Sequence, residues 1–248
     1  MTASNYDPAA YGEYLAADYD ALYSAIPDTE DAVACLAELT GGGSLLEMGI
    51  GTGRLALPLA ARGVAVQGIE ASPAMVAELR KLPGGEDLPV AVGSFADTVV
   101  PDERFAVVVL ALHTIFGLPT QDEKVACFAN AERHLDGGGV FVVEATVLDV
   151  GAFRRGQAVI PRFANAERVE LQVLRYDAST QIIETTNVHL SNDGVRLNGF
   201  TNAYASPREL DLMARLGGLH LRERWSTWTR APFTGISTRH VSIYGRPE

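Results

Sequence analysis

Three alternating glycines are the clearest chemical feature of the sequence. The segment Leu45–Arg54 reads Leu-Leu-Glu-Met-Gly-Ile-Gly-Thr-Gly-Arg, between an apolar run and a helical stretch. Glycine allows the backbone to turn sharply and leaves space for a ligand to lie against it. A dinucleotide is one ligand that uses such a turn, but its G-x-G-x-x-G fingerprint needs a glycine where this chain has Arg54. A long side chain there conflicts with close helix–strand packing, so an NAD-dependent oxidoreductase is the weaker hypothesis.

Glu70 is a second candidate, because it ends the next apolar run, Val66–Glu70. A carboxylate at the end of a strand can accept hydrogen bonds from both hydroxyls of a ribose. The alternative is a solvated acid in a loop. The place of Glu70 at a strand end favours ribose binding.

His113 is the candidate base or substrate-orienting group. It follows the apolar run 105–112, where a parallel sheet presents its ligand crevice, although a structural histidine is an equal alternative. Glu144 ends the fifth predicted strand and either faces the substrate or supports a neighbouring residue. His134, at a helix end beside a glycine turn, is expected to cap that helix. His240 alternates into the last strand and is expected to be structural.

These residues need a sheet to position them, and the chain predicts one. Strands are expected at 44–48, 64–69, 88–93, 105–111 and 139–145, with helices near 53–62, 72–81 and 121–135. Nearly continuous Val, Ile and Leu runs are typical of strands that helices bury on both faces. The alternation therefore indicates an α/β chain with a parallel, doubly wound sheet and right-handed crossovers.

Two further regions flank or interrupt this pattern. Before the sheet, 11–23 and 28–39 read as helices, and the tyrosines at 11, 14, 19 and 23 form either a core stripe or a lid over a ligand. At 163–204 a two-residue period, with turns at 177–180 and 192–194, predicts a three-stranded antiparallel insertion after the fifth strand. The segment 206–209 then predicts a capped helix, and closing strands are expected at 219–228 and 238–245.

Length and charge restrict the domain organisation and the partners. The 248 residues suit a single domain, 1–248, with 1–43 as an N-terminal helical lid and 163–204 as the cap. Twenty basic against 31 acidic residues give a net charge of −11, which disfavours nucleic acids and membranes as partners because both need a basic face. Two cysteines without motif spacing are expected as buried thiols, which suit a reducing cytoplasm. No basic residue precedes Arg54, so the N-terminal segment lacks the basic region of a signal peptide, and we expect a cytoplasmic protein.

The motifs resemble those of class I S-adenosylmethionine-dependent methyltransferases. The family's first motif, E/D-x-G-x-G-x-G, is matched by 47–53, and its second, acidic motif by Glu70 within Val66–Met75. The resemblance covers roughly residues 40–146 by motif, and implies a Rossmann-like sheet with helices on both faces and the small antiparallel β cap. It implies the cofactor S-adenosyl-L-methionine, the product S-adenosyl-L-homocysteine, and a cofactor site of Tyr19, Glu47, Gly49, Gly51, Gly53, Arg54, Glu70, Ala71, Met75, Ser94, Phe95 and Ala111.

The resemblance also assigns roles within this site. Phe95 is expected to stack on adenine, whereas Ser94 stands where the family often has an Asp for the adenine amino group. The backbone carbonyl of Ala111 is expected to accept from the methionine ammonium, and Tyr19 to meet the methionine end. Because no arginine precedes Arg54, the methionine carboxylate must be held by Arg54, by tyrosine hydroxyls or by backbone N–H groups.

The expected acceptor is a small molecule methylated on nitrogen or oxygen, such as a specialised metabolite or an amino sugar, with His113 as the catalytic residue. The insertion resembles that of sugar N-methyltransferases, where it covers the active site and contributes to dimers, which implies a homodimer through the cap. The paired acids that hold a metal in catechol O-methyltransferases are missing from Leu112-His113-Thr114, so a metal-independent mechanism is predicted. The remaining alternative is a catalytically silent member that binds the cofactor.

Overall fold

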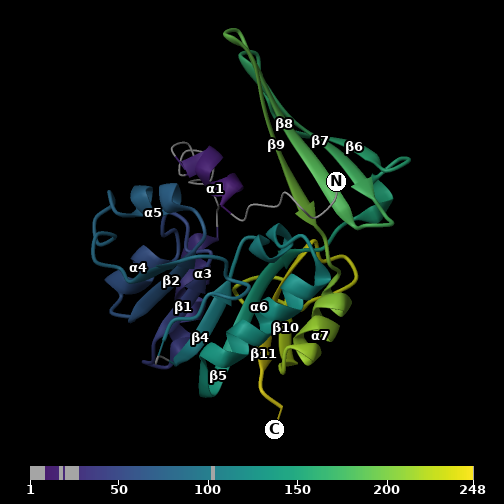
Figure 1. The fold of residues 1–248 in the computed structure, drawn as a ribbon. Coiled ribbons are helices and arrows are strands. Elements are labelled where there is room, and N and C mark those ends of the chain that lie inside the picture. The colour runs from purple at the N-terminus through teal and green to yellow at the C-terminus, as the bar shows by residue number, and fades with distance from the viewer. Residues whose placement is uncertain (1–8, 17–18, 20–27, 102–103, 248) are drawn as a thin grey trace.

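A seven-stranded sheet forms the body of the protein, whose computed structural model describes residues 9–16, 19, 28–101 and 104–247 (Figure 1). Its strands are ordered β10-β11-β5-β4-β1-β2-β3. Neighbours from β3 to β5 are parallel, whereas β11 runs antiparallel to both β5 and β10. The strands are β1 Leu45–Met48, β2 Val66–Glu70, β3 Val90–Val92, β4 Phe105–Leu110, β5 Leu135–Thr146, β10 His220–Trp225 and β11 Arg239–Gly245.

Helices cover both faces of this sheet, which confirms the predicted doubly wound α/β fold. The helices are α1 Ala10–Leu15, α3 Thr29–Thr40, α4 Ala56–Ala61, α5 Pro73–Leu79, α6 Gln121–His134 and α7 Pro207–Leu216, with short 3-10 turns η3 Thr114–Gly117 and η4 Val150–Ala152. Alternate residues of β4 face opposite cores. Val108 belongs to the cluster with α6 and α7, and Val107 to the cluster with α3 and α4. This alternation explains why the strand reads as a continuous apolar run.

A second sheet projects from the body, between β5 and α7 (Figure 1). It has four antiparallel strands in the order β6-β7-β8-β9: β6 Gln157–Ala164, β7 Arg168–Asp177, β8 Ile182–Ser191 and β9 Gly194–Ala203. The prediction of three strands was therefore wrong by one. The missed strand, β6, contains Pro161 and has a register irregularity between Pro161 and Phe163. Proline cannot donate to a ladder and is tolerated at an edge, so β6 lacked the pattern of a strand.

Local signals at the helix ends agree with the structure. The predicted capping box of α7 is confirmed, with Ser206 accepting from Glu209 N–H and the Glu209 side chain accepting from Ser206 N–H. Cys35 and Cys127 are buried free thiols, as predicted. Of the predicted first helix, α1 and residue 19 are described, whereas Tyr23 lies outside the described residues.

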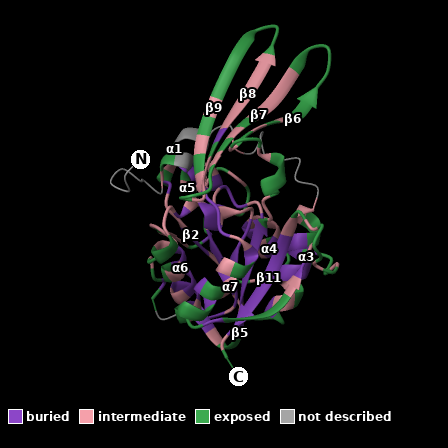
Figure 2. Cartoon of the chain, turned by 90° about the vertical axis from the view of Figure 1, so that its right-hand side faces the viewer, coloured by how far each residue is buried: buried purple, intermediate pink, exposed green. Residues whose placement is uncertain are grey.

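Burial differs between the two sheets. Figure 2 shows buried residues concentrated in the seven-stranded sheet, whereas the projecting sheet is mostly intermediate or exposed. No helix among the described residues is long and apolar enough to cross a bilayer.

The carboxyl ends of β1, β2, β3 and β4 meet at one edge of the body. The strand order reverses between β1 and β4, and doubly wound sheets bind ligands at such a reversal.

Candidate functional site

The glycine turn after β1 has a left-handed backbone at each of its three glycines, with φ of +71° at Gly49, +55° at Gly51 and +90° at Gly53. A Cβ at Gly53 would lie 2.6 Å from Leu79 Cδ1, so this glycine allows the turn to pack against α5. Among the described residues, a Cβ at Gly51 would meet nothing within 4 Å. The turn therefore packs through Gly53 and leaves open space above Gly51, as a surface that receives a ligand requires.

Glu70 lies at the edge of this open space. Its Oε2 accepts a hydrogen bond from Gly51 N–H at 2.9 Å, and its Oε1 accepts from Ser72 N–H at 2.9 Å. Burial raises the pKa of Glu70, and the N–H groups of Ser72, Gly51 and Ala71 oppose this effect. A carboxylate has about four acceptor positions, so oxygens already bound to two amides can still accept from ligand hydroxyls.

Glu47 points a buried carboxyl group to the same edge. It is 5% exposed, and its Oε2 has no hydrogen-bond partner among the described residues. Burial raises its pKa to about 8, while the charge of Arg54 and the N–H of Ala56 lower it. A buried oxygen without a partner is unfavourable, so this position suits a ligand that brings a hydrogen-bond donor or a positive charge.

His113 follows β4 in a left-handed turn, with φ of +50° at Leu112 and +63° at His113. Its ring Nδ1 is buried and has no partner among the described residues. Burial lowers the pKa of His113, the carboxylate of Glu144 opposes this, and Arg239 and Arg54 lower it further. The imidazole is therefore neutral at neutral pH, which is the form that accepts a proton.

A second histidine, His240, lies close enough to interact electrostatically with His113. It is fully buried, its Nδ1 is 2.8 Å from Ser242 Oγ, and its Nε2 has no partner among the described residues. Burial lowers its pKa to about 3, with contributions from the charges of Arg224 and His113. No sequence signal groups it with His113, because the antiparallel pairing of β11 with β5 is what brings it to this edge.

The remaining predicted cofactor residues lie at or beside the ends of the same strands, apart from Tyr19. Ser94 and Phe95 follow β3, and a Cβ at Gly49 would be 4.0 Å from Phe95 Cδ1. The carbonyl of Ala111 already accepts from Thr114 N–H at 3.2 Å, which leaves it one lone pair. Arg54 donates from Nη1 to Thr29 Oγ1 at 2.9 Å. Ala71 follows Glu70, Met75 is buried within α5, and Tyr19 is a half-buried residue of the N-terminal segment.

The N-terminal segment contacts this site through α1. Glu13 Oε1 accepts from Ser72 Oγ at 2.8 Å and from Ala74 N–H at 2.9 Å. A Cβ at Gly12 would lie 2.4 Å from Ser72 Cβ, so α1 packs closely against the residues that follow Glu70. These contacts join the N-terminal segment to the residues that follow Glu70, the candidate ribose-binding residue.

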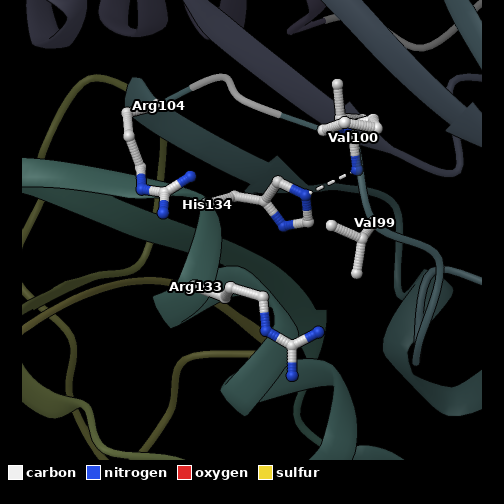
Figure 3. Close-up of a pocket in the computed structure, with 6 residues that line it drawn as sticks. Val99, Val100, Arg104, Arg133 and His134 are labelled. Atoms are coloured by element: carbon white, nitrogen blue, oxygen red, sulfur yellow. Dashed lines mark hydrogen bonds between the residues drawn. The ribbon is translucent and has the colours of Figure 1, made fainter.

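A separate hollow of 560 Å³ lies at the amino end of β4 and the end of α6, away from these residues (Figure 3). His134 borders it and is held on both sides. Its Nε2 accepts from Val100 N–H at 2.9 Å, and the other ring nitrogen, Nδ1, is 2.7 Å from the Asn130 carbonyl, to which it donates when neutral. His134 thus bonds the carbonyl four residues before it within α6 and the backbone at Val100, so it ties the helix end to a loop, whereas the predicted capping of free carbonyls at the helix end is not seen in the described part of the chain.

Comparison with known proteins identifies relatives of the whole chain. Residues 45–139 match the model of a family described as a methyltransferase domain. The cypemycin N-terminal methyltransferase of a Streptomyces species is 27% identical, over 97% of this chain and 99% of that protein. The structure of the CcbJ methyltransferase from Streptomyces caelestis has a TM-score of 0.91 and 34% identity, and covers 98% of this chain and 100% of that one. CalS10, an amino pentose methyltransferase from Micromonospora echinaspora solved with S-adenosylmethionine bound, shares the fold, with a TM-score of 0.68, 22% identity and coverage of 91% and 95%.

Proposed function

Because this chain belongs to the S-adenosylmethionine-dependent methyltransferases, we propose that it transfers the methyl group of that cofactor to a nitrogen or oxygen atom of a small molecule. The observation that carries the proposal is the edge of the sheet at β1, β2 and β4. There, Glu70 accepts from the N–H of Gly51, whose Cβ position is open, and Glu47 Oε2 and His113 Nδ1 are buried without a partner among the described residues.

These residues fit the cofactor chemically. Glu70 would accept from the ribose hydroxyls, and Phe95 would stack on the adenine with Ser94 beside it. Glu47 Oε2, which has no hydrogen-bond partner in the described ranges, and the Ala111 carbonyl, which accepts there from Thr114 N–H, would receive the methionine ammonium. For the other cofactor contacts we propose Gly49, Gly51 and Gly53 along the backbone, Ala71 and Met75 beside the ribose, and Arg54 with Tyr19 at the methionine carboxylate.

When bound, S-adenosylmethionine supplies a methyl group that is already activated by its sulfonium. The protein therefore has to align the acceptor and exclude water, rather than activate the carbon. His113, held neutral by burial, would take up the proton that the acceptor loses or orient the acceptor atom. The N-terminal segment and the projecting sheet would cover the acceptor, as a lid at 1–43 and a cap at 163–204.

A nitrogen acceptor is the first class to test. The relatives include one named as a cypemycin N-terminal methyltransferase and one named as an amino pentose methyltransferase. An amine needs only to lose its proton to become a nucleophile, and a neutral histidine beside the crevice suits that requirement. An amino sugar or another specialised metabolite with a free amine would carry such a group. We propose a mechanism without a metal ion for either acceptor atom.

Calorimetric titration with S-adenosylmethionine, S-adenosylhomocysteine and NAD tests the cofactor. We expect micromolar-range binding of the two sulfur nucleosides and none of NAD. Binding of NAD alone would refute the proposed site. Transfer of a labelled methyl group to a panel of amines, amino sugars and phenols then tests the reaction. Cofactor binding without transfer to any of these acceptors would favour a catalytically silent member.

We also propose that the projecting sheet forms a homodimer, because one of its faces is apolar across all four strands. The cross-strand pairs Val159–Val173, Leu171–Val188 and Leu190–Val195 share this face with Val169 and Leu197. Val159, Val195 and Leu197 are 61%, 65% and 59% exposed, and a second copy of the face would cover them. Exposed apolar patches of this kind mark interaction sites.

Light scattering during size-exclusion chromatography measures the proposed assembly. The parent chain should elute as a dimer, and Leu197→Glu should give a monomer because the interface would bury an unpaired carboxylate on each copy. Leu216→Glu is the control, since Leu216 is 77% exposed on α7, outside this face. A monomeric parent chain, or a dimer that both variants retain, would exclude this interface.

A further inference from the structure

The turn that carries His113 adopts a backbone that its residues disfavour. Leu112 and His113 have φ of +50° and +63°, and both have a Cβ. Left-handed backbone is rare for residues other than glycine, because the Cβ approaches the following carbonyl oxygen. Two such residues in succession persist only where neighbouring groups hold them.

Both amides of this turn are held by one residue of the adjacent strand. Leu112 N–H donates to Glu144 Oε2 at 3.0 Å, and His113 N–H donates to the Glu144 backbone carbonyl at 3.1 Å. Glu144 belongs to β5, the parallel neighbour of β4, so it lies level with the residues that follow β4. The His113 ring is free of such a constraint at Nδ1, which has no partner among the described residues. The backbone therefore sets where the ring points.

The Glu144 carboxylate is itself fixed by charge. Glu144 is 2% exposed, and its Oε1 is 3.5 Å from Arg239 Nη1, while Oε2 serves Leu112. The same Arg239 nitrogen forms an ion pair with Asp28, immediately before α3. Arg239 begins β11 and pairs with Thr146 of β5. A buried carboxylate needs such partners, and here one oxygen faces the arginine and the other the strained turn.

We propose that Glu144 is a positioning residue for methyl transfer, which holds the left-handed turn 112–113 so that the His113 ring faces the acceptor, with Arg239 orienting its carboxylate. This inference rests on the proposed function of His113. Glu144 acts through the turn and does not touch the cofactor. Its removal should therefore affect the turn and the transfer step, and leave cofactor binding nearly unchanged.

Hydrogen exchange tests the turn without any acceptor. In Glu144→Ala the amides of Leu112 and His113 should exchange at least about tenfold faster than in the parent chain, since both lose an ordered partner or its support. Glu144→Gln keeps an acceptor oxygen for Leu112 and should stay close to the parent. Affinity for S-adenosylhomocysteine should change by less than about threefold in both variants. Unchanged exchange in Glu144→Ala would overturn the proposal even if the protein proved not to be a methyltransferase.

Rescue by glycine separates positioning from a merely structural role. With tritiated S-adenosylmethionine and the first amine identified in the acceptor screen, Glu144→Ala should lower kcat by roughly 10–100-fold. Adding Leu112→Gly should restore part of this rate, because glycine adopts the left-handed turn without the clamp. Arg155→Gly is the matched control, since Arg155 is also left-handed, with φ of +53°, in a different turn. Equal rescue by both glycines, no rescue by Leu112→Gly, or parallel loss of cofactor affinity and rate would each refute positioning by Glu144.

Discussion

Gly51→Ala adds one methyl group to the open space above this residue. We predict that the substitution weakens ligand binding through this methyl group, and that its effect on stability can be measured separately. In Gly51→Ala the new Cβ meets no atom of the structurally described part of the chain within 4 Å, so the substitution leaves the packing of the turn intact. The backbone stays at φ of +55°, where alanine costs about 1–2 kcal/mol relative to glycine. For a chain of this size that corresponds to a melting temperature lower by about 2–8 °C.

The affinity for the cofactor should also fall, for a reason that is independent of this loss of stability. The methyl group occupies the space in which the proposed ligand lies against the backbone, so we expect S-adenosylhomocysteine to bind at least about tenfold more weakly, or about 1.4 kcal/mol. Titration calorimetry measures the affinity, and thermal unfolding without ligand measures the stability. Both are measured on the same preparation, so a partly unfolded variant would be recognised.

Two other glycines provide matched controls. Gly63 has φ of +85° and open space around its Cβ position, but it lies beyond α4, so Gly63→Ala should lose similar stability and keep full affinity. Gly53→Ala would place its Cβ 2.6 Å from Leu79 and should be the least stable of the three variants. If Gly51→Ala and Gly63→Ala bind S-adenosylhomocysteine equally well, the cofactor does not lie over Gly51 and the proposed site is wrong.

Three further predictions concern the ionisable groups. Glu70→Ala should weaken S-adenosylhomocysteine binding by about 1.5–3 kcal/mol through lost charge-assisted hydrogen bonds, whereas Glu78→Ala, which removes an exposed helix ion pair with Lys81, should not change the calorimetric affinity. Burial raises the pKa of Glu47 to about 8, so the folded protein keeps a proton that the unfolded chain releases above its ordinary pKa of 4.5. The free energy of unfolding without ligand should therefore fall as the pH rises from about 5 to about 8, and melting curves of Glu47→Gln should show a weaker dependence. His113→Ala should reduce the rate of methyl transfer far more than cofactor affinity, and equal losses in the two assays would point to a structural histidine.

Local signals were enough to predict the parallel sheet and the residues of the glycine turn. Continuous apolar runs such as β4, the alternating glycines of 49–53 and the capping box at Ser206 each depend on residues a few positions apart. Their physical causes are equally local: burial of a strand on both faces, a backbone that turns left-handed, and a side chain that satisfies a helix amide. Glu70 and His113 could be named because the first ends β2 and the second lies just beyond β4.

Only the tertiary structure decided which distant residues meet beside His113. Glu144 lies on β5, Arg239 and His240 on β11, and Asp28 immediately before α3, and β11 reaches the end of β5 because it inserts antiparallel beside it. No periodicity encodes that pairing, since a strand's pattern specifies which face is buried and not which neighbour it joins. The strained turn at 112–113 is likewise invisible in the sequence, where a leucine and a histidine give no sign of a left-handed backbone. It exists because a carboxyl group and a carbonyl from the neighbouring strand bind its two amides, and that arrangement depends on the folded sheet.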